Sequence, residues 1–223
     1  MKPTTILFDL DGTLTDSGPG IINSVRYALT EMGHEIPDRL ERFIGPPLES
    51  SFREFCGMDH DEAERAIAYY RTRYELSGMS ENRVYDGIPE MLEKLREHGF
   101  RLAVATSKYE LYAKKVTDLF GLTGYFDGIY GSEKNAGRTE KADVIRYALR
   151  EMGDPDRDSV LMIGDRMHDI EGAHEAGIPC MGVLWGYGSR EELTESGADI
   201  TALSPQEAAD MICMMNKQSY GGM

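Results

Sequence analysis

The sequence is short of cysteine, of positive charge and of long apolar runs. Its three cysteines, Cys56, Cys180 and Cys213, lie far apart and form no CxxC pair, which argues against a disulfide framework or a zinc site. We expect them to be small apolar core side chains in a reducing cytosol. No apolar run approaches the roughly 18 residues that a membrane-spanning helix needs. Residues 1–5 lead straight into a predicted strand without the regions of a signal peptide, so we expect a cytoplasmic protein.

The shortage of positive charge excludes two classes of partner. The chain has 223 residues, with 24 Lys and Arg against 39 Asp and Glu, which gives a formal net charge of -15. Such a field repels nucleic acid and anionic membranes, so we expect neither as a partner. It also disfavours anionic substrates unless a local cation gathers them. The composition therefore predicts a metal ion or a focused basic pocket wherever an anion binds.

Short apolar segments alternate with amphipathic ones along most of the chain. The apolar segments have strand length and are rich in Ile, Val and Leu without polar alternation, as in strands buried on both faces: 5–8, 102–106, 126–130, 160–163 and 180–184. The amphipathic segments between them end just before a glycine, as many helices do: 87–98, 109–120, 139–151 and 169–176. This alternation predicts the α/β class, with a Rossmann-like parallel sheet and helices on both of its faces.

One long stretch breaks the alternation. After the first predicted strand no strand pattern returns until residue 102, and three segments of helical periodicity come first: 21–32, 46–56 and 61–76. We therefore predict a core domain made of residues 1–16 and 82–223, with an all-helical domain, residues 17–81, inserted into it.

Glycine and polar residues flank the predicted insertion. Gly18-Pro19-Gly20 and the stretch 77–84 are the natural hinges. We expect the insertion to pivot there as a rigid body, because a site beside it must admit substrate and then exclude water. Residues 217–223 are expected to fray.

Polar side chains gather where the predicted strands end, and the carboxyl ends of parallel strands are where ligands bind in open α/β sheets. These side chains are Asp9 and Asp11 after the first strand, Thr106, Ser107 and Lys108 at the second, Asp165 and Asp169 after the fourth, and Lys141 at the start of the preceding helix. Several carboxylates concentrated together bind a hard cation such as Mg²⁺. That cation would screen an attacking carboxylate from an anionic phosphate, and a second carboxyl could protonate the leaving oxygen and later deprotonate water. The constellation predicts phosphoryl transfer.

Four motifs in this order resemble those of the haloacid dehalogenase superfamily. "DLDGTLTDS", from Asp9, resembles its DxDGT motif, and "VATSK", ending at Lys108, resembles its second motif. Lys141 in "RTEKADVI" fits the third, and Asp165 and Asp169 in "IGDRMHDI" fit the GDxxxD of the fourth. A helical insertion between the first two motifs is typical of members with an α-helical cap. "VLWGYGSREEL" resembles the phosphoglycolate phosphatase-like branch.

The resemblance implies a role for each acidic residue of the motifs. Asp9 would be the nucleophile that forms an aspartyl-phosphate, and Asp11 would be the general acid and base. Mg²⁺ would be held by Asp9, Asp165 and Asp11, the last through its backbone carbonyl. Asp169 would support these ligands from behind, through Lys141 or a metal-bound water.

The resemblance also implies which residues bind phosphate. These are Thr106, the backbone amide of Ser107, and Lys141. The third motif lacks the KP-x-P ending that many relatives show, since Ala142 and Asp143 follow Lys141, so Lys134 and Arg138 remain alternatives for the lysine.

Residues that select the substrate are harder to predict. Lys108 follows the second motif, and Arg42 and Gly45 lie in "RFIGPPLESSF", where a rigid Gly-Pro-Pro turn precedes a helix N-terminus that suits an anionic group. Other arginines of the insertion are expected to be solvated or paired with glutamates. Arg166 departs from the family pattern, which usually has a smaller polar residue after the metal-binding aspartate.

These observations predict a Mg²⁺-dependent phosphatase acting on a small cytosolic phosphomonoester such as phosphoglycolate. A 5′-nucleotidase is the nearest alternative, and a phosphosugar mutase is another. A dehalogenase is disfavoured because that chemistry uses neither a residue like Asp11 nor Mg²⁺. A signalling receiver domain would take its phosphoacceptor from the third strand, and a silent scaffold would not keep every motif residue. We expect a small-molecule phosphate ester as the only partner of a monomer or homodimer.

Overall fold

A six-stranded parallel sheet forms the centre of the protein. The computed structural model describes residues 2–133 and 137–217. The strands are β1 (Thr5–Phe8), β2 (Arg101–Tyr109), β3 (Gly128–Ser132), β4 (Val160–Gly164), β5 (Cys180–Val183) and β6 (Ile200–Ala202). Their order is β3-β2-β1-β4-β5-β6, and all neighbours run parallel. The predicted fold class is confirmed, and β6 is a strand that the sequence pattern did not indicate.

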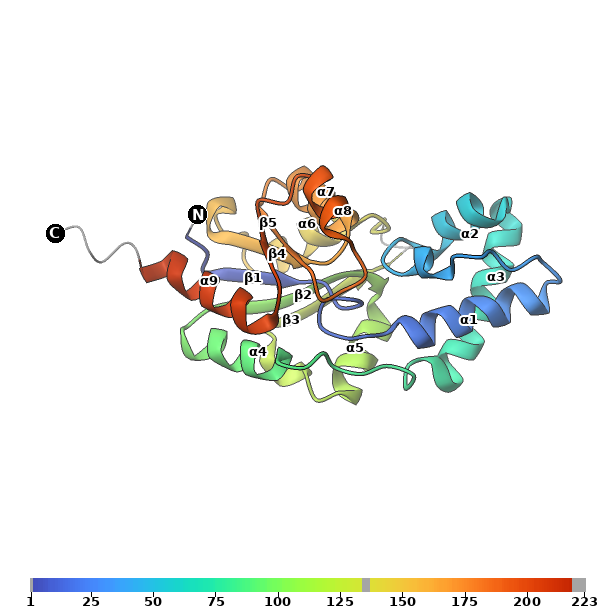
Figure 1. Cartoon of the computed structure of the whole chain (residues 1–223), viewed down its shortest axis with the longest axis horizontal. Coiled ribbons are helices and arrows are strands. Elements are labelled where there is room, and N and C mark those ends of the chain that lie inside the picture. The colour runs from blue at the N-terminus through green and yellow to red at the C-terminus, as the bar shows by residue number, and fades with distance from the viewer. Residues whose placement is uncertain (1, 134–136, 218–223) are drawn as a thin grey trace.

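Helices cover both faces of the sheet (Figure 1). On one face lie α4 (Ile88–Glu97), α5 (Glu110–Leu119) and α9 (Pro205–Lys217), and on the other lie α6 (Lys141–Glu151), α7 (Met167–Glu175) and α8 (Arg190–Glu195). Strand β1 shows why its sequence is apolar throughout: Ile6 and Phe8 pack on the first face and Leu7 on the second. All four residues of β1 are buried, and the strand lies in the middle of the sheet, between β2 and β4.

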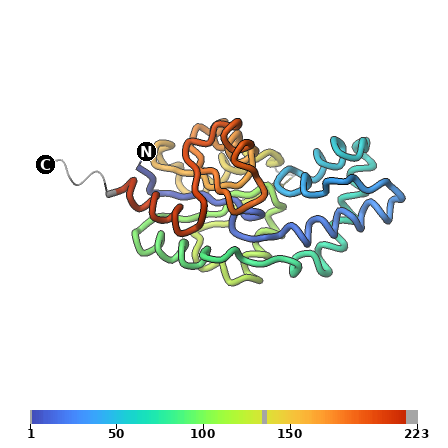
Figure 2. Tube along the Cα trace, viewed as in Figure 1, coloured from blue at the N-terminus to red at the C-terminus, as the bar shows by residue number. Residues whose placement is uncertain are grey.

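The chain between β1 and β2 folds into helices that lie beside the sheet, at one end of the elongated molecule (Figure 2). They are α1 (Gly18–Glu31), the 3-10 turn η1 (Leu40–Phe43), α2 (Leu48–Cys56), α3 (His60–Arg73) and the π-helical turn η2 (Tyr74–Gly78). Asp59 starts α3 because its carboxylate accepts a hydrogen bond from the Glu62 amide at 2.9 Å, a capping interaction. These helices enclose a hydrophobic cluster of their own. We call this helical segment the cap; the domain boundaries at residues 16 and 82 stay a prediction.

Two linkers connect the cap to the core, and they lie side by side. The Asp16 amide donates to the Arg83 carbonyl at 2.8 Å, and the Gly20 amide donates to the Glu81 carbonyl at 3.1 Å. Glu81 also forms an ion pair with Arg73 at 2.6 Å. Gly18–Gly20, predicted as a hinge, is the first turn of α1, so the non-helical part of the first linker ends at Ser17.

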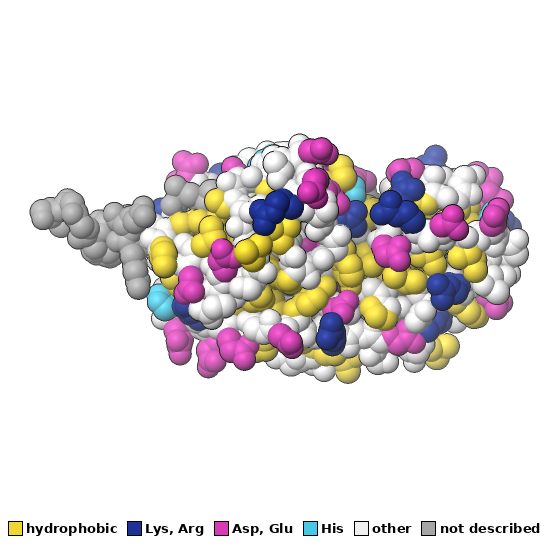
Figure 3. Space-filling view, viewed as in Figure 1, with side chains coloured by type: hydrophobic (Ala, Val, Ile, Leu, Met, Phe, Trp, Pro, Cys, Tyr) yellow, Lys and Arg dark blue, Asp and Glu magenta, His cyan; other side chains and the backbone are white. Residues whose placement is uncertain are grey.

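The surface agrees with the acidic composition. On the face shown in Figure 3, acidic and basic side chains are interspersed over both the core and the cap.

Within residues 2–133 and 137–217, every helix is too short or too polar to span a lipid bilayer. The predicted fraying from residue 217 falls almost wholly on residues outside the described ranges.

Candidate active site

The sheet order brings the motif residues to one place. Asp9 follows β1 directly and its amide donates to the Ile163 carbonyl of β4 at 2.9 Å, while Asp165 follows β4. The register between β2 and β3 shifts between Ala105 and Tyr109, so the second motif lies at an irregular part of β2. Bulges redirect side chains next to many active sites.

Three buried carboxylates form the centre of the site. Carboxylate oxygens of Asp9, Asp165 and Asp169 all lie within 4.8 Å of one another, and these residues are at most 4% exposed. Lys141 faces two of them, with its Nζ 2.6 Å from Asp9 Oδ1 and 2.7 Å from Asp169 Oδ1. The same Nζ donates to the Ala105 carbonyl at 3.0 Å.

One lysine does not balance three buried carboxylates, and the pKa values reflect this. Burial raises the pKa of Asp9 to about 6, although the neighbouring Lys141 lowers it. Burial also raises the pKa of Asp165 well above its usual range, and the negative charges of Asp169 and Asp9 raise it further. Burial alone would lower the pKa of Lys141, yet the two aspartates beside it hold that pKa above its usual value. An all-oxygen donor set with uncompensated negative charge fits a hard divalent cation such as Mg²⁺.

Neighbouring residues hold the Asp165 carboxylate in place. The Thr13 hydroxyl donates to Oδ1 at 3.1 Å, and the Tyr187 amide donates to Oδ2 at 2.8 Å. Gly12 has a φ of +90°, and a Cβ there would lie 2.3 Å from Asp165 Oδ2. In the DGT sequence, the glycine therefore leaves space for this carboxylate and the threonine binds it. Sequence reasoning gave no role to Tyr187, although it lies in the segment that indicated the phosphatase branch.

The Asp11 carboxylate lies apart from this cluster. Its Oδ2 accepts from Lys108 Nζ at 2.7 Å, and the ammonium group of Lys108 lies 4.7 Å from the centre of the Tyr74 ring. The other oxygen, Oδ1, is buried without a hydrogen-bond partner among the residues that the structure describes. The structure thus groups the carboxylate of Asp169 with those of Asp9 and Asp165. The metal contact predicted for Asp11 is through its backbone carbonyl and stays a prediction.

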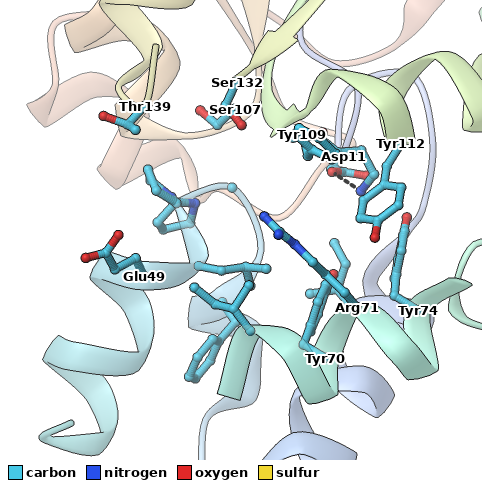
Figure 4. Close-up of a pocket in the computed structure, with 18 of the residues that line it drawn as sticks. Asp11, Glu49, Tyr70, Arg71, Tyr74, Ser107, Tyr109, Tyr112, Ser132 and Thr139 are labelled. Carbon is cyan, nitrogen blue, oxygen red and sulfur yellow. Dashed lines mark hydrogen bonds and ion pairs between the residues drawn. The ribbon is translucent and has the colours of Figure 1, made fainter. Parts of the chain in front are cut away.

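A cavity of about 320 Å³ lies between the strand ends and the cap (Figure 4). The core contributes residues that include Asp11, Ser107 and Lys108, and the cap contributes Gly45-Pro46-Pro47 and the aromatic and charged side chains of α3. Four tyrosines stand in its wall: Tyr70, Tyr74, Tyr109 and Tyr112. Arg71 extends from α3 into the open space, with its guanidinium carbon 5.2 Å from the Tyr109 ring centre.

The predicted phosphate-binding residues occupy different depths. Thr106 is buried and its hydroxyl accepts from the Lys108 amide at 3.3 Å, whereas Ser107 lines the cavity. Lys141 contacts Asp9. Arg138, the alternative to Lys141, instead forms an ion pair with Glu110 at 3.1 Å, and its guanidinium carbon lies 3.9 Å from the centre of the Tyr147 ring. Lys134 lies outside the described residues.

Two of the three residues predicted to select the substrate line the cavity, and the third does not. Lys108 and Gly45 line the cavity. Arg42 does not: it pairs with Glu54 at 3.5 Å, and its guanidinium carbon lies 3.9 Å from the centre of the Phe55 ring. Arg71 is the cap arginine that reaches the cavity. We had expected it, like the other arginines of the insertion, to be solvated or paired with a glutamate; its signal in the sequence is its place on a helix between Tyr70 and Tyr74.

Comparison with known proteins decides the family. Residues 6–183 match the family model described as haloacid dehalogenase-like hydrolase. The chain belongs to this family. Its Asp9 follows the first strand and precedes a helical insertion, which is not the arrangement expected of a receiver domain.

Relatives of the chain carry several names. A 5′-nucleotidase from Pseudomonas aeruginosa is 47% identical over 210 residues, covering 91% of this chain and 95% of that protein. Tyrosine-protein kinase PtkA from Mycobacterium tuberculosis is 39% identical over 201 residues, covering 89% and 68%. A phosphoglycolate phosphatase from Aquifex aeolicus is 31% identical over 209 residues, covering 93% and 95%.

A solved structure extends the similarity to three dimensions. The crystal structure of a predicted phosphatase from Clostridium acetobutylicum superimposes with a TM-score of 0.91 at 42% identity, covering 96% of this chain and 100% of that one. The arrangement of sheet and cap is therefore shared with that protein.

Proposed function

We propose that this protein is a Mg²⁺-dependent phosphatase that hydrolyses a phosphomonoester through an aspartyl-phosphate on Asp9. The observation that carries the proposal is the buried group of Asp9, Asp165 and Asp169 around Lys141. Family membership and the phosphatase names among the relatives support hydrolysis of a phosphate ester. Asp9 and Asp165 would hold the Mg²⁺ together with the Asp11 carbonyl, with Asp169 placed behind Lys141.

The residues divide the reaction into two steps. In the first, an oxygen of Asp9 attacks phosphorus, the ester P–O bond breaks, and the leaving oxygen takes a proton from Asp11. In the second, Asp11 takes a proton from water as that water attacks the aspartyl-phosphate, which releases phosphate and restores Asp9. Bound Mg²⁺ supplies positive charge that offsets the repulsion between carboxylate and phosphate. Lys141, the Thr106 hydroxyl and the Ser107 amide would take phosphate oxygens.

The direct test is phosphate release from a panel of phosphomonoesters, with Mg²⁺ and with EDTA. The panel includes phosphoglycolate, the nucleoside 5′-monophosphates and sugar phosphates. We expect release that requires Mg²⁺. Phosphate moved within a sugar phosphate instead of being released would support a mutase and contradict the proposal.

Binding of Mg²⁺ can be measured without any substrate. Saturating Mg²⁺, at about 100 times its dissociation constant, should stabilise the folded protein by ~2.7 kcal/mol and raise the melting temperature by roughly 5–10 °C. Asp165→Asn should abolish this rise, because it removes a buried ligand but keeps the side chain's shape. Thermal unfolding with and without Mg²⁺ measures both.

A second acidic group makes the control for this experiment informative. Glu49, His60 and Glu64 also lie within ligand distance of one another on the cap, and His60 and Glu64 are exposed. Glu49→Gln should leave the Mg²⁺ effect unchanged. An unchanged effect in Asp165→Asn together with its loss in Glu49→Gln would place the metal on the cap and contradict the proposed site.

The cavity favours nucleoside 5′-monophosphates over phosphoglycolate as substrates. Its volume of about 320 Å³ and its four tyrosines suit a flat, stacking leaving group better than a two-carbon acid. Of the cations Arg71 and Lys108 in its wall, the second already pairs with Asp11 at 2.7 Å. Lys108 is therefore not free to bind a second anionic group on the substrate. The name of the Pseudomonas aeruginosa relative agrees with this preference.

Substitution of Arg71 distinguishes the two substrates. Arg71→Met keeps the aliphatic stem but removes the charged fork that could hydrogen-bond a base edge. We expect KM for the preferred nucleotide to rise about tenfold, the effect of losing one good polar or stacking contact, with little change for phosphoglycolate. Steady-state kinetics on both substrates measure this.

The matched control is Arg65→Met, an exposed arginine of the same helix that is not in the cavity wall. It should leave both KM values unchanged. If Arg71→Met instead weakens phosphoglycolate and spares the nucleotides, Arg71 binds a carboxylate, and phosphoglycolate becomes the favoured substrate.

A further inference from the structure

Arg166 links the metal-binding loop to the cap. It follows Asp165 directly, and its own amide donates to Asp169 Oδ2 at 3.0 Å. Its side chain is only 15% exposed and reaches two partners. Nε donates to Glu192 Oε1 of α8 at 2.8 Å, and Nη1 donates to the Ile44 carbonyl of the cap at 2.6 Å.

The cap end of this link is the start of a cavity wall. Ile44 is fully buried, and it is followed by Gly45, Pro46, Pro47 and Leu48, all of which line the cavity. Gly45 packs on the arginine so closely that a Cβ there would lie 3.3 Å from Arg166 Cγ. The wall therefore rests on Arg166 through both a hydrogen bond and direct packing.

The geometry requires an arginine. Glu192 fixes the Nε edge of the guanidinium, which leaves Nη1 aimed at the Ile44 carbonyl. A lysine has a single ammonium group and cannot hold both directions with the same rigidity. Glu192 is itself anchored, because it also accepts from the Met167 amide at 3.0 Å. The position of the Ile44 carbonyl in the cap is thus fixed relative to the loop that carries Asp165.

Tyr187 makes a second link of the same kind. Its amide holds Asp165 Oδ2, and its hydroxyl donates to Asp16 Oδ1 and accepts from the Gly18 amide, both at 2.6 Å. The Asp165 loop is therefore connected to the cap in two places, by Arg166 at the wall and by Tyr187 at the linker.

We propose that Arg166 is a positioning residue, which sets the distance between the 44–48 wall and the reacting centre and so fixes where the leaving group of the substrate lies. This inference rests on the proposed function, because the cavity that this wall lines is assigned to the leaving group there. Arg166 touches neither the phosphate nor the metal in this account. Its loss should weaken binding of a substrate that fills the cavity more than it slows the chemical steps.

The test compares Arg166→Met, Arg166→Lys and a control, Arg96→Met. Arg96 joins α4 to Asp127 by an ion pair at 2.9 Å and lies in the core away from the cavity wall. The first readout is hydrogen exchange of the 40–48 segment in protein free of metal and substrate. Losing a hydrogen bond to a charged group should speed this exchange about tenfold in Arg166→Met, less in Arg166→Lys, and not in Arg96→Met.

The second readout separates KM from kcat. For a nucleoside monophosphate, Arg166→Met should raise KM about tenfold while kcat falls less than about threefold. For acetyl phosphate, whose leaving group is too small to reach the wall, neither constant should change. Wild-type exchange in Arg166→Met, or a fall in kcat alone for both substrates, would overturn the proposal.

Failure of this inference and failure of the proposed function give different results. If no phosphate ester is hydrolysed, the function fails, while the exchange readout still tests whether Arg166 holds the wall. If Arg166→Met does not fold, Glu192→Met takes its place, since it removes the acceptor of Arg166 Nε and so frees one edge of the guanidinium while keeping the arginine. It should speed exchange of the 40–48 segment, and unchanged exchange there would equally overturn the proposal.

Discussion

Asp9→Asn is expected to lower turnover by ~10⁴-fold or more, because an amide oxygen is a poor nucleophile toward phosphorus and loss of a nucleophile has effects of this size. The change keeps the shape of a side chain that is 4% exposed, so the fold should survive. Steady-state phosphate release measures the loss. Acid-quenched protein should carry covalent phosphate on Asp9 in the wild type and none in the variant.

A matched control is Asp127→Asn. Asp127 lies just before β3, where its Oδ2 accepts from the Leu102 amide at 3.1 Å, at the opposite end of the strands from the site. It should turn over substrate like the wild type. Turnover in Asp9→Asn within about tenfold of the wild type would show that another group attacks phosphorus and would contradict the aspartyl-phosphate route.

Lys141→Met is expected to reduce both activity and stability. Lys141 is the ammonium between Asp9 and Asp169, and its removal leaves two buried carboxylates without that partner. Breaking a buried ion pair in this way costs about 3–5 kcal/mol of unfolding free energy. Activity should fall ~10²–10³-fold, because a preorganised cation that would contact the phosphate is lost. Urea unfolding at pH 7 and phosphate release measure the two effects.

Two comparisons make the Lys141 result specific. Lys114→Met removes an exposed lysine that pairs with Glu110 within α5. It should change the free energy of unfolding by less than about 0.5 kcal/mol. Mg²⁺ should recover part of the stability lost in Lys141→Met, because it restores positive charge beside Asp9. A variant as stable as the wild type without metal would show that Asp9 and Asp169 do not carry charge together in the folded protein.

The elements that the sequence predicted well are those with a strong physical signal. Strand β1 is apolar on both faces, and its two aspartates follow it directly in the sequence. Asp9 could be expected to meet Asp165, because parallel pairing brings the carboxyl ends of β1 and β4 to the same edge of the sheet. Strand β6 escaped prediction because it has three residues at the sheet edge, and only Ala202 among them is buried.

The parts that the sequence did not predict depend on tertiary contacts. Lys108, which pairs with Asp11, lies where the register of β2 shifts between Ala105 and Tyr109, and this shift has no signature in the residue pattern. The helical periodicity of residues 61–76 indicated a buried face; Tyr70 lies on it and is buried, but it also lines the cavity. A helical pattern gives the buried face and not what lies opposite it.

The paired linkers have a mechanical consequence. The Asp16 amide donates to the Arg83 carbonyl, and the Tyr85 amide donates to the Leu14 carbonyl at 3.2 Å, so the two linkers are joined to each other on either side of residue 84. Two chain segments joined by hydrogen bonds bend about a single axis far more easily than they twist or slide. We expect the cap to have one rotational degree of freedom, in which Arg71 and the 44–48 wall move together. A leaving group held between them would then lose all its cap contacts in one concerted event, which makes product release an all-or-none step.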